Sequence, residues 1–157
     1  MPKAPPEMAV ITKVYDLVIW SCEHVAKFPR SHRFTLGDRL EIRLYEVLEK
    51  LLRAKYSRDR LPTLRDVNMD LELLRFQFRI AKDLRCLSIE SYGHAFRTVN
   101  EVGQLLGGWI KAAAATPAGQ RPSNTGAGDE TAGRSVGAAD QLPKPPAGGR
   151  TRETRQT

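Results

Sequence analysis

Apolar residues recur with helical spacing between Leu64 and Leu87, a stretch that contains neither glycine nor proline. At 100° per residue they fall on two separate faces of one helix. The first face comprises Leu64, Val67, Leu71, Leu74, Phe78 and Ala81, and the second comprises Met69, Leu73, Phe76, Ile80 and Leu87. A surface helix of a monomer needs only one apolar face. We therefore expect the first face to form the core of the domain and the second to meet a partner. The alternative is that the second face packs on another helix of the same chain.

Arg75, Arg79 and Lys82 fill one gap between these two apolar faces. Because they recur at spacings of four and three, they form one cationic stripe along the helix. Such a stripe is either a solvated surface or a contact for an anionic partner.

The stretch from Ser31 to Tyr56 repeats this layout. Its core face is predicted to contain Leu40, Leu44, Val47, Leu48 and Leu51, and its second apolar strip contains Tyr45, Leu52 and Tyr56. Basic side chains lie on a different side: Arg39, Arg43, Lys50 and Arg53. Two helices with the same three-part layout favour self-assembly over an isolated bundle.

Two further helices complete the predicted fold. One runs from Ala9 to Phe28, where Pro29 ends it, and its inward positions are Val10, Val14, Leu17, Val18, Ser21, Val25 and Phe28. The other follows Ser88 and continues to about Ala115. Ser31, Thr63 and Ser88 are the predicted N-caps of the second, third and fourth helices. Four helices with short connections and no strand pattern predict an all-α, up-down-up-down antiparallel four-helix bundle.

The composition divides the chain into three parts. Residues 1–8 are proline-rich and predicted to be flexible, and residues 9–115 form the bundle domain. The remaining 42 residues, 116–157, contain 5 prolines and 7 glycines but few large apolar residues, so we expect a disordered tail. The N-terminus lacks the pattern of a signal peptide, and no apolar run is long enough for a membrane span. These features predict a cytoplasmic protein without a membrane association.

The formal net charge is +7, and the part before the tail carries +5 of it, which is compatible with an acidic partner such as a nucleic acid. The inward faces are expected to carry essentially no carboxylates. The sequence contains no Glu-x-x-His pair of a di-metal bundle, no phosphate-binding loop and no nucleophile motif. We therefore predict no catalytic residues, no metal and no cofactor, and a protein that is not an enzyme.

Seven short motifs occur in a characteristic order and spacing. They are Tyr15-Asp16-Leu17, residues 28–34 (FPRSHRF), Leu36-Gly37-Asp38-Arg39, Ala54-Lys55-Tyr56, Leu74-Arg75-Phe76, residues 79–84 (RIAKDL) and residues 102–111 (VGQLLGGWIK). Together they resemble the accessory variability determinant (Avd) proteins of diversity-generating retroelements. The wider group includes four-helix proteins encoded in ribosomal-RNA intervening sequences. The resemblance covers about residues 9–114.

This resemblance implies a four-helix bundle that assembles into a barrel-like homopentamer with a basic surface. It implies two kinds of partner, the retroelement reverse transcriptase and its template RNA or cDNA, and a role in mutagenic retrohoming. Arg75, Arg79 and Lys82 match positions where the family keeps basic residues, and the binding role extends to Arg39 and Arg43 as weaker candidates. The predicted oligomer interface comprises Met69, Leu73, Phe76, Ile80, Tyr45, Leu52 and Tyr56.

Two other interpretations stay open at the level of the sequence. One is a protein of the ribosomal-RNA intervening-sequence type. The other is a structural oligomer or interaction module that has no nucleic-acid partner. A neighbouring reverse-transcriptase gene with near-identical repeats distinguishes the first from a retroelement protein, and a salt-dependent RNA-binding assay identifies the second.

Overall fold

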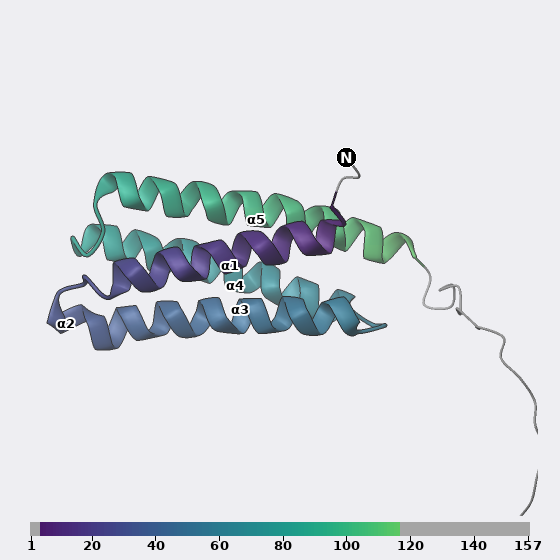
Figure 1. The fold of residues 1–157 in the computed structure, drawn as a ribbon, viewed down its shortest axis with the longest axis horizontal. Helices are drawn as coiled ribbons and strands as arrows, with labels where there is room; N and C mark the ends of the chain where they lie inside the picture. The colour runs from purple at the N-terminus through teal and green to yellow at the C-terminus, as the bar shows by residue number, and fades with distance from the viewer. Residues whose placement is uncertain (1–3, 117–157) are drawn as a thin grey trace, which may run out of the picture. The chain divides into compact units, whose positions relative to one another are not determined.

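The computed structural model describes residues 4–116, which form four long helices joined by short connections (Figure 1). The long helices are α1 (Pro6–Val25), α3 (Asp38–Tyr56), α4 (Leu61–Asp83) and α5 (Ile89–Ala115). A short helix α2 (Arg30–His32) and a π-helical turn η1 (Arg33–Gly37) connect α1 to α3. The described residues contain no strand, so the predicted all-α class is confirmed. The tail is predicted for residues 116–157, of which 117–157 lie outside the described residues, as do residues 1–3.

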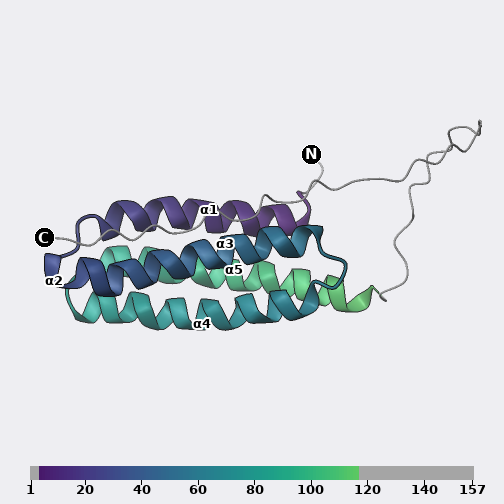
Figure 2. The same cartoon turned by 90° about the horizontal axis from the view of Figure 1, so that it is seen from below.

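Consecutive long helices run in opposite directions, as Figures 1 and 2 show from two sides. Each packs on two neighbours: α1 on α3, α3 on α4, α4 on α5, and α5 back on α1. Helices α1 and α4 therefore occupy diagonal corners of the bundle, and so do α3 and α5. The predicted up-down-up-down antiparallel four-helix bundle is confirmed.

The core consists of the inward faces that the periodicity predicts. All seven inward positions of the first helix are buried, and so are the six residues of the first face of α4. In α3, Leu48 is only partly buried, and Ala54 joins the core in addition to the predicted residues. Helix α5 contributes Ala95, Val99, Val102, Leu106 and Trp109. Each large aliphatic or aromatic side chain buried in this way stabilises the fold by about 1.5–3 kcal/mol.

The first helix begins and ends three residues earlier than predicted. Pro6 occupies its first turn, where a missing N–H costs no hydrogen bond, so the proline-rich start does not exclude a helix. After Val25 the chain forms tighter turn bonds, from Lys27 N–H to the His24 carbonyl (3.0 Å) and from Phe28 N–H to the Val25 carbonyl (3.0 Å). These turns still bring Phe28 into the core, as the inward pattern predicts.

The second predicted helix is interrupted at its start. Pro29 precedes α2, and Ser31 lies inside it without a capping bond, so the prediction of Ser31 as N-cap is wrong. The backbone then widens into η1, where Asp38 N–H donates to the Arg33 carbonyl. Gly37 allows this turn to pack on α1, because a Cβ there would lie 2.8 Å from Val25 Cγ1. A one-turn break of this kind is not visible in the hydrophobic pattern.

Helix α4 is shifted toward the N-terminus relative to the prediction. It begins at Leu61 with Pro62 in its first turn, so Thr63 is not its N-cap. It ends at Asp83, and Arg85 takes a positive φ of 58° in the turn that follows. This turn directs Leu87 into the core, so its assignment to the second apolar face is wrong. The N-cap of α5 is confirmed, because Ser88 Oγ accepts from Ser91 N–H at 3.0 Å.

No helix in the described part of the chain combines the length and the apolar character that crossing a membrane requires.

Candidate nucleic-acid and assembly surfaces

The cationic stripe of α4 begins with Arg75, which lies in the groove between α4 and α5. Its Nε donates to Asn100 Oδ1 at 3.0 Å, and its Nη1 pairs with Glu72. Its Nη2 lies 3.1 Å from the position that a Cβ on Gly103 would take. The side chain is only 23 % exposed, so Arg75 links the two helices and presents an edge of its guanidinium to solvent.

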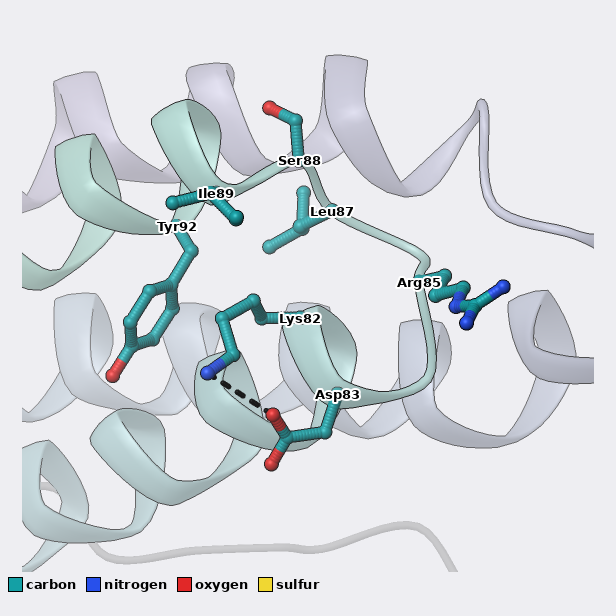
Figure 3. Close-up of a pocket in the computed structure, with 7 residues that line it drawn as sticks. All are labelled: Lys82, Asp83, Arg85, Leu87, Ser88, Ile89 and Tyr92. Carbon is teal, nitrogen blue, oxygen red and sulfur yellow. Dashed lines mark ion pairs between the residues drawn. The ribbon is translucent and has the colours of Figure 1, made fainter.

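Arg79 and Lys82 lie further along the same stripe and share one carboxylate. Arg79 Nε is 3.9 Å from Asp83, and its side chain is 64 % exposed. Lys82 Nζ lies 3.0 Å from Asp83 and 5.2 Å from the centre of the Tyr92 ring. Figure 3 shows the ion pair and the position of the Tyr92 ring. Three cations and the two carboxylates of Glu72 and Asp83 leave the stripe with a net charge of +1. Arg79 is therefore its most available cation.

Lys82 also borders an open hollow at the turn between α4 and α5 (Figure 3). The ammonium group contacts both Asp83 and Tyr92, while the Arg85 side chain points away from these three side chains. The lining combines apolar and charged side chains: Lys82, Asp83, Arg85, Leu87, Ser88, Ile89 and Tyr92.

The two weaker candidates on α3 differ in their surroundings. Arg43 Nη1 lies 2.8 Å from Asp70 and 3.7 Å from Glu46, so it is part of an ion-pair network between α3 and α4. Arg39 is exposed, and within residues 4–116 no carboxylate lies within 4.0 Å of its guanidinium. The structure thus separates two candidates that the sequence grouped on one stripe.

Asp70 is the centre of this network and is only 4 % exposed. It accepts from Arg43 and, at 2.7 Å, from Lys50 Nζ, which also contacts Asp66 at 2.6 Å. Burial alone would lower the pKa of Lys50, but the hydrogen bonds and charges of Asp66 and Asp70 outweigh it and raise that pKa. The expectation of inward faces without carboxylates is therefore wrong at Asp70. Its spacing of three from Val67 and four from Leu74 already placed it beside the core face.

We expect Asp70→Asn to destabilise the fold by about 1.5–3 kcal/mol, because two partly buried cations lose a charge-assisted hydrogen bond. Glu46→Gln is the matched control, since it removes the second carboxylate near Arg43 from an exposed position and should cost less than about 1 kcal/mol. Urea unfolding of both variants measures the difference. Equal midpoints would show that the network contributes little.

The second apolar face of α4 is exposed on the chain. Met69, Leu73, Phe76 and Ile80 all lie on the side of α4 that points away from its core, and Phe76 is 61 % exposed. Packing of this face on another helix of the same chain is therefore excluded among the described residues. We call these four residues the α4 face.

The second apolar strip of α3 lies on a different side of the bundle. Tyr45, Leu52 and Tyr56 are exposed on the edge of α3 that faces α1, whereas Arg43 and Lys50 face α4. Exposed apolar residues of α1, Tyr15 and Ile19, continue this surface. We call these five residues, Tyr15, Ile19, Tyr45, Leu52 and Tyr56, the α1/α3 face. The residues predicted to form one oligomer interface thus belong to two separate surfaces.

A hydrogen bond fixes the α1/α3 face internally. The Tyr45 hydroxyl lies 3.2 Å from Cys22 Sγ, which connects α3 to α1. This hydrogen bond is the largest of the causes that raise the pKa of Tyr45 to about 12.

The fold and these surfaces define a class of helical-bundle proteins with exposed apolar faces and surface cations. Among residues 4–116, no cluster of three histidine, cysteine or acidic side chains is arranged to hold a metal ion. Residues 8–113 match the model of the bAvd-like family, and the chain belongs to this family. The match confirms the resemblance to Avd proteins and places the chain among accessory proteins of the retroelement kind. No curated protein sequence matches it significantly.

Proposed function

We propose that this chain is a non-enzymatic, cytoplasmic accessory protein of a diversity-generating retroelement. It binds the reverse transcriptase together with the template RNA or cDNA and supports mutagenic retrohoming. Family membership supports the accessory role, and the net charge of +7 suits a polyanionic partner. The observation that carries the proposal is the separation of the α4 face from the α1/α3 face. Two separate apolar faces favour assembly of identical chains into a ring, and such a ring presents one cationic stripe of α4 for every chain.

The two apolar faces favour head-to-tail assembly of identical chains. They lie on different helices and point in different directions around the bundle, so the α4 face of one chain can meet the α1/α3 face of the next. Such a heterologous contact, repeated, closes into a ring when the rotation between neighbours allows it. Five copies is the number that the family resemblance implies, and we propose a homopentamer.

A ring of identical chains presents several copies of the weakly charged cationic stripe of α4. Arg79 lies beside the α4 face, so each interface brings one copy of this exposed guanidinium to the same height on the ring. Five copies of a stripe with net charge +1 give a periodic positive surface. Such a surface binds nucleic acid mainly through phosphates, with little sequence preference.

We expect Arg79→Ala to weaken binding of RNA and of DNA alike. It should also flatten the dependence of log affinity on log salt by about 0.7–0.9 for each phosphate that the variant no longer binds, summed over the subunits on the strand. Arg53→Ala is a matched control, because Arg53 is also an exposed arginine in an i,i+4 pair, with Glu49 at 3.7 Å. Fluorescence anisotropy at several salt concentrations measures both variants.

Each outcome of this experiment has a defined meaning. If the wild-type protein shows no salt-dependent binding at low salt, the nucleic-acid role is wrong and a structural oligomer is the better description. If Arg79→Ala behaves like Arg53→Ala, the α4 stripe is not the binding surface. Co-purification of the reverse transcriptase with wild type and with Arg79→Ala then tests whether this stripe serves the polymerase instead.

A further inference from the structure

The connection between α1 and α3 and the first residues of α3, together residues 27–39, form a second cationic surface outside the α4 stripe, which we call the connection. It carries Lys27, Arg30, Arg33 and Arg39 against a single acidic residue, Asp38. Among the described residues, no carboxylate lies within 4.0 Å of the Lys27, Arg30 or Arg39 head groups. By contrast, Arg43, Arg75, Arg79 and Lys82 all have carboxylate partners. Of the five predicted binding residues, Arg39 is thus the one without a carboxylate partner among the described residues, and it lies in the same segment as the unpaired Lys27 and Arg30.

The connection is held in a defined conformation. Phe28 is buried at one end of it, and Gly37 packs directly on Val25 at the other. Between them, Arg33 donates to the Ala26 carbonyl, and η1 replaces a regular α-helical turn. Single π-helical turns of this kind occur frequently at functional sites. A ligand that binds here meets a surface that is already ordered.

Phe34 projects from the middle of this basic surface and is 65 % exposed. Arg30 precedes Phe34 by four residues, and Arg39 follows it by five. Five residues is the spacing of the hydrogen-bonded residues in a π-helix. Arg30 and Arg39 are thus each about one turn from Phe34 along the axis. Along this segment, one exposed phenylalanine therefore lies between two exposed arginines.

The faces of two other aromatic rings near cations are already occupied. Lys55 Nζ lies 5.3 Å from the centre of the Tyr56 ring, and Lys82 Nζ lies 5.2 Å from that of Tyr92. No cation of the described chain stands in this way over Phe34. Because Phe34 is also largely exposed, its ring is accessible to a planar ligand.

We propose that residues 27–39 form a contact site for single-stranded RNA, in which Phe34 stacks on an unpaired base while Arg30, Arg39 and Lys27 contact the flanking phosphates. An aromatic ring within a cationic surface is the usual combination for single-stranded nucleic acid. The base must come from a single strand, because a base inside a duplex is stacked between its neighbours and offers no free face. This site rests on the proposed nucleic-acid role and specifies which form of nucleic acid it accepts and where.

The test uses the full chain and two fluorescein-labelled RNAs, an oligoadenylate and a blunt duplex of the same length. We expect Phe34→Leu, which keeps the apolar volume but removes the ring, to weaken oligoadenylate binding by roughly five- to a hundredfold. Duplex binding should change by less than about twofold, because it depends on phosphate contacts. Phe34→Tyr should restore wild-type affinity for oligoadenylate. Phe96→Leu is the matched control, because Phe96 is another exposed phenylalanine, on α5.

The phosphate contacts have a control of equal charge. Arg30→Ala with Arg39→Ala should flatten the salt dependence of oligoadenylate binding, by about 0.7 for each phosphate that the variant no longer binds. Arg58→Ala with Arg65→Ala removes the same charge at the opposite end of the bundle. This control variant should change the salt dependence of oligoadenylate binding less. Light scattering must show the same oligomeric state for every variant.

Three results would overturn this proposal while leaving the proposed function intact. The first is wild-type affinity for oligoadenylate in Phe34→Leu. The second is an equal loss of affinity for single-stranded and duplex RNA in that variant. The third is a loss of the oligomer or of reverse-transcriptase co-purification with unchanged RNA binding, which would assign the connection to a protein contact. Absence of RNA binding by the wild-type chain would instead refute the nucleic-acid role as a whole.

Discussion

Replacing Phe76 and Ile80 together with glutamate should dissociate the oligomer and leave the helical content close to that of wild type. Both side chains project from α4 away from the core, so the bundle tolerates charge there. In a buried interface between chains, each unpaired carboxylate costs several kcal/mol, and dissociation relieves that cost. Multi-angle light scattering measures the mass of the oligomer, and circular dichroism measures the helical content.

A variant with the same added charge serves as the control. Ile89→Glu with Gln104→Glu also introduces two carboxylates at exposed positions, but on α5 and outside both apolar faces. It should keep the wild-type mass. A monomeric wild-type protein, or a double glutamate variant of α4 that keeps its full mass, would contradict the assembly.

Mixing two dissociated variants distinguishes head-to-tail from symmetric pairing. Leu52→Glu with Tyr56→Glu disrupts the α1/α3 face, and the Phe76→Glu, Ile80→Glu variant disrupts the α4 face. Each alone should be monomeric. A mixture should form a one-to-one heterodimer, because one intact α4 face and one intact α1/α3 face remain. If each face paired with its own copy, each variant alone would form a homodimer, and the mixture would contain the two homodimers but no heterodimer.

The helix pattern predicted the core correctly because burial follows a simple period. Residues such as Leu71 and Phe78 fall on one side of the wheel, and the structure buries that side. The same argument identified the α4 face, since a second apolar stripe on a helix has no place in a small bundle. Both conclusions depend only on residue spacing and polarity.

Helix boundaries depended on contacts that the pattern does not contain. Thr63 and Ser31 have the chemistry of N-caps, but prolines near Leu61 and Arg30 start the helices earlier. Helix α4 ends in a turn in which Arg85 takes a positive φ. The residue types of this turn do not predict such a conformation, because none of them favours a positive φ. The π-helical turn likewise accompanies a close approach of Gly37 to Val25, which the hydrophobic pattern does not contain.

The candidate cations show the same limit. Wheel positions grouped Arg39 with Arg43 and placed Arg75 beside Arg79, but exposure depends on the neighbouring helix. Arg43 faces Asp70 across the α3–α4 contact, and Arg75 reaches Asn100 across the α4–α5 contact. The order of the helices around the bundle decides which cations are neutralised, and one sequence alone does not specify it.

Phe78→Ala should lower the free energy of unfolding by about 3–5 kcal/mol, because it deletes a buried ring and leaves a cavity. Phe78 is 2 % exposed, and its ring packs edge-on against Trp20 of α1, with centroids 6.4 Å apart. Since α1 and α4 are diagonal, this contact spans the centre of the bundle. Phe34→Ala deletes the same group from an exposed position and should cost less than about 1 kcal/mol.

Assembly contributes to apparent stability, so the comparison needs a monomeric background. The Phe76→Glu, Ile80→Glu variant supplies one if it dissociates as expected. Urea unfolding of Phe78→Ala and Phe34→Ala in that background then measures the core alone, and the two m-values must agree for the midpoints to be compared. Equal losses of stability at Phe78 and Phe34 would mean that the inward face of α4 has been assigned to the wrong side. A large loss at Phe78 alone shows that the face carrying Phe78 is the inward one, so that the opposite face carrying Phe76 points away from the core.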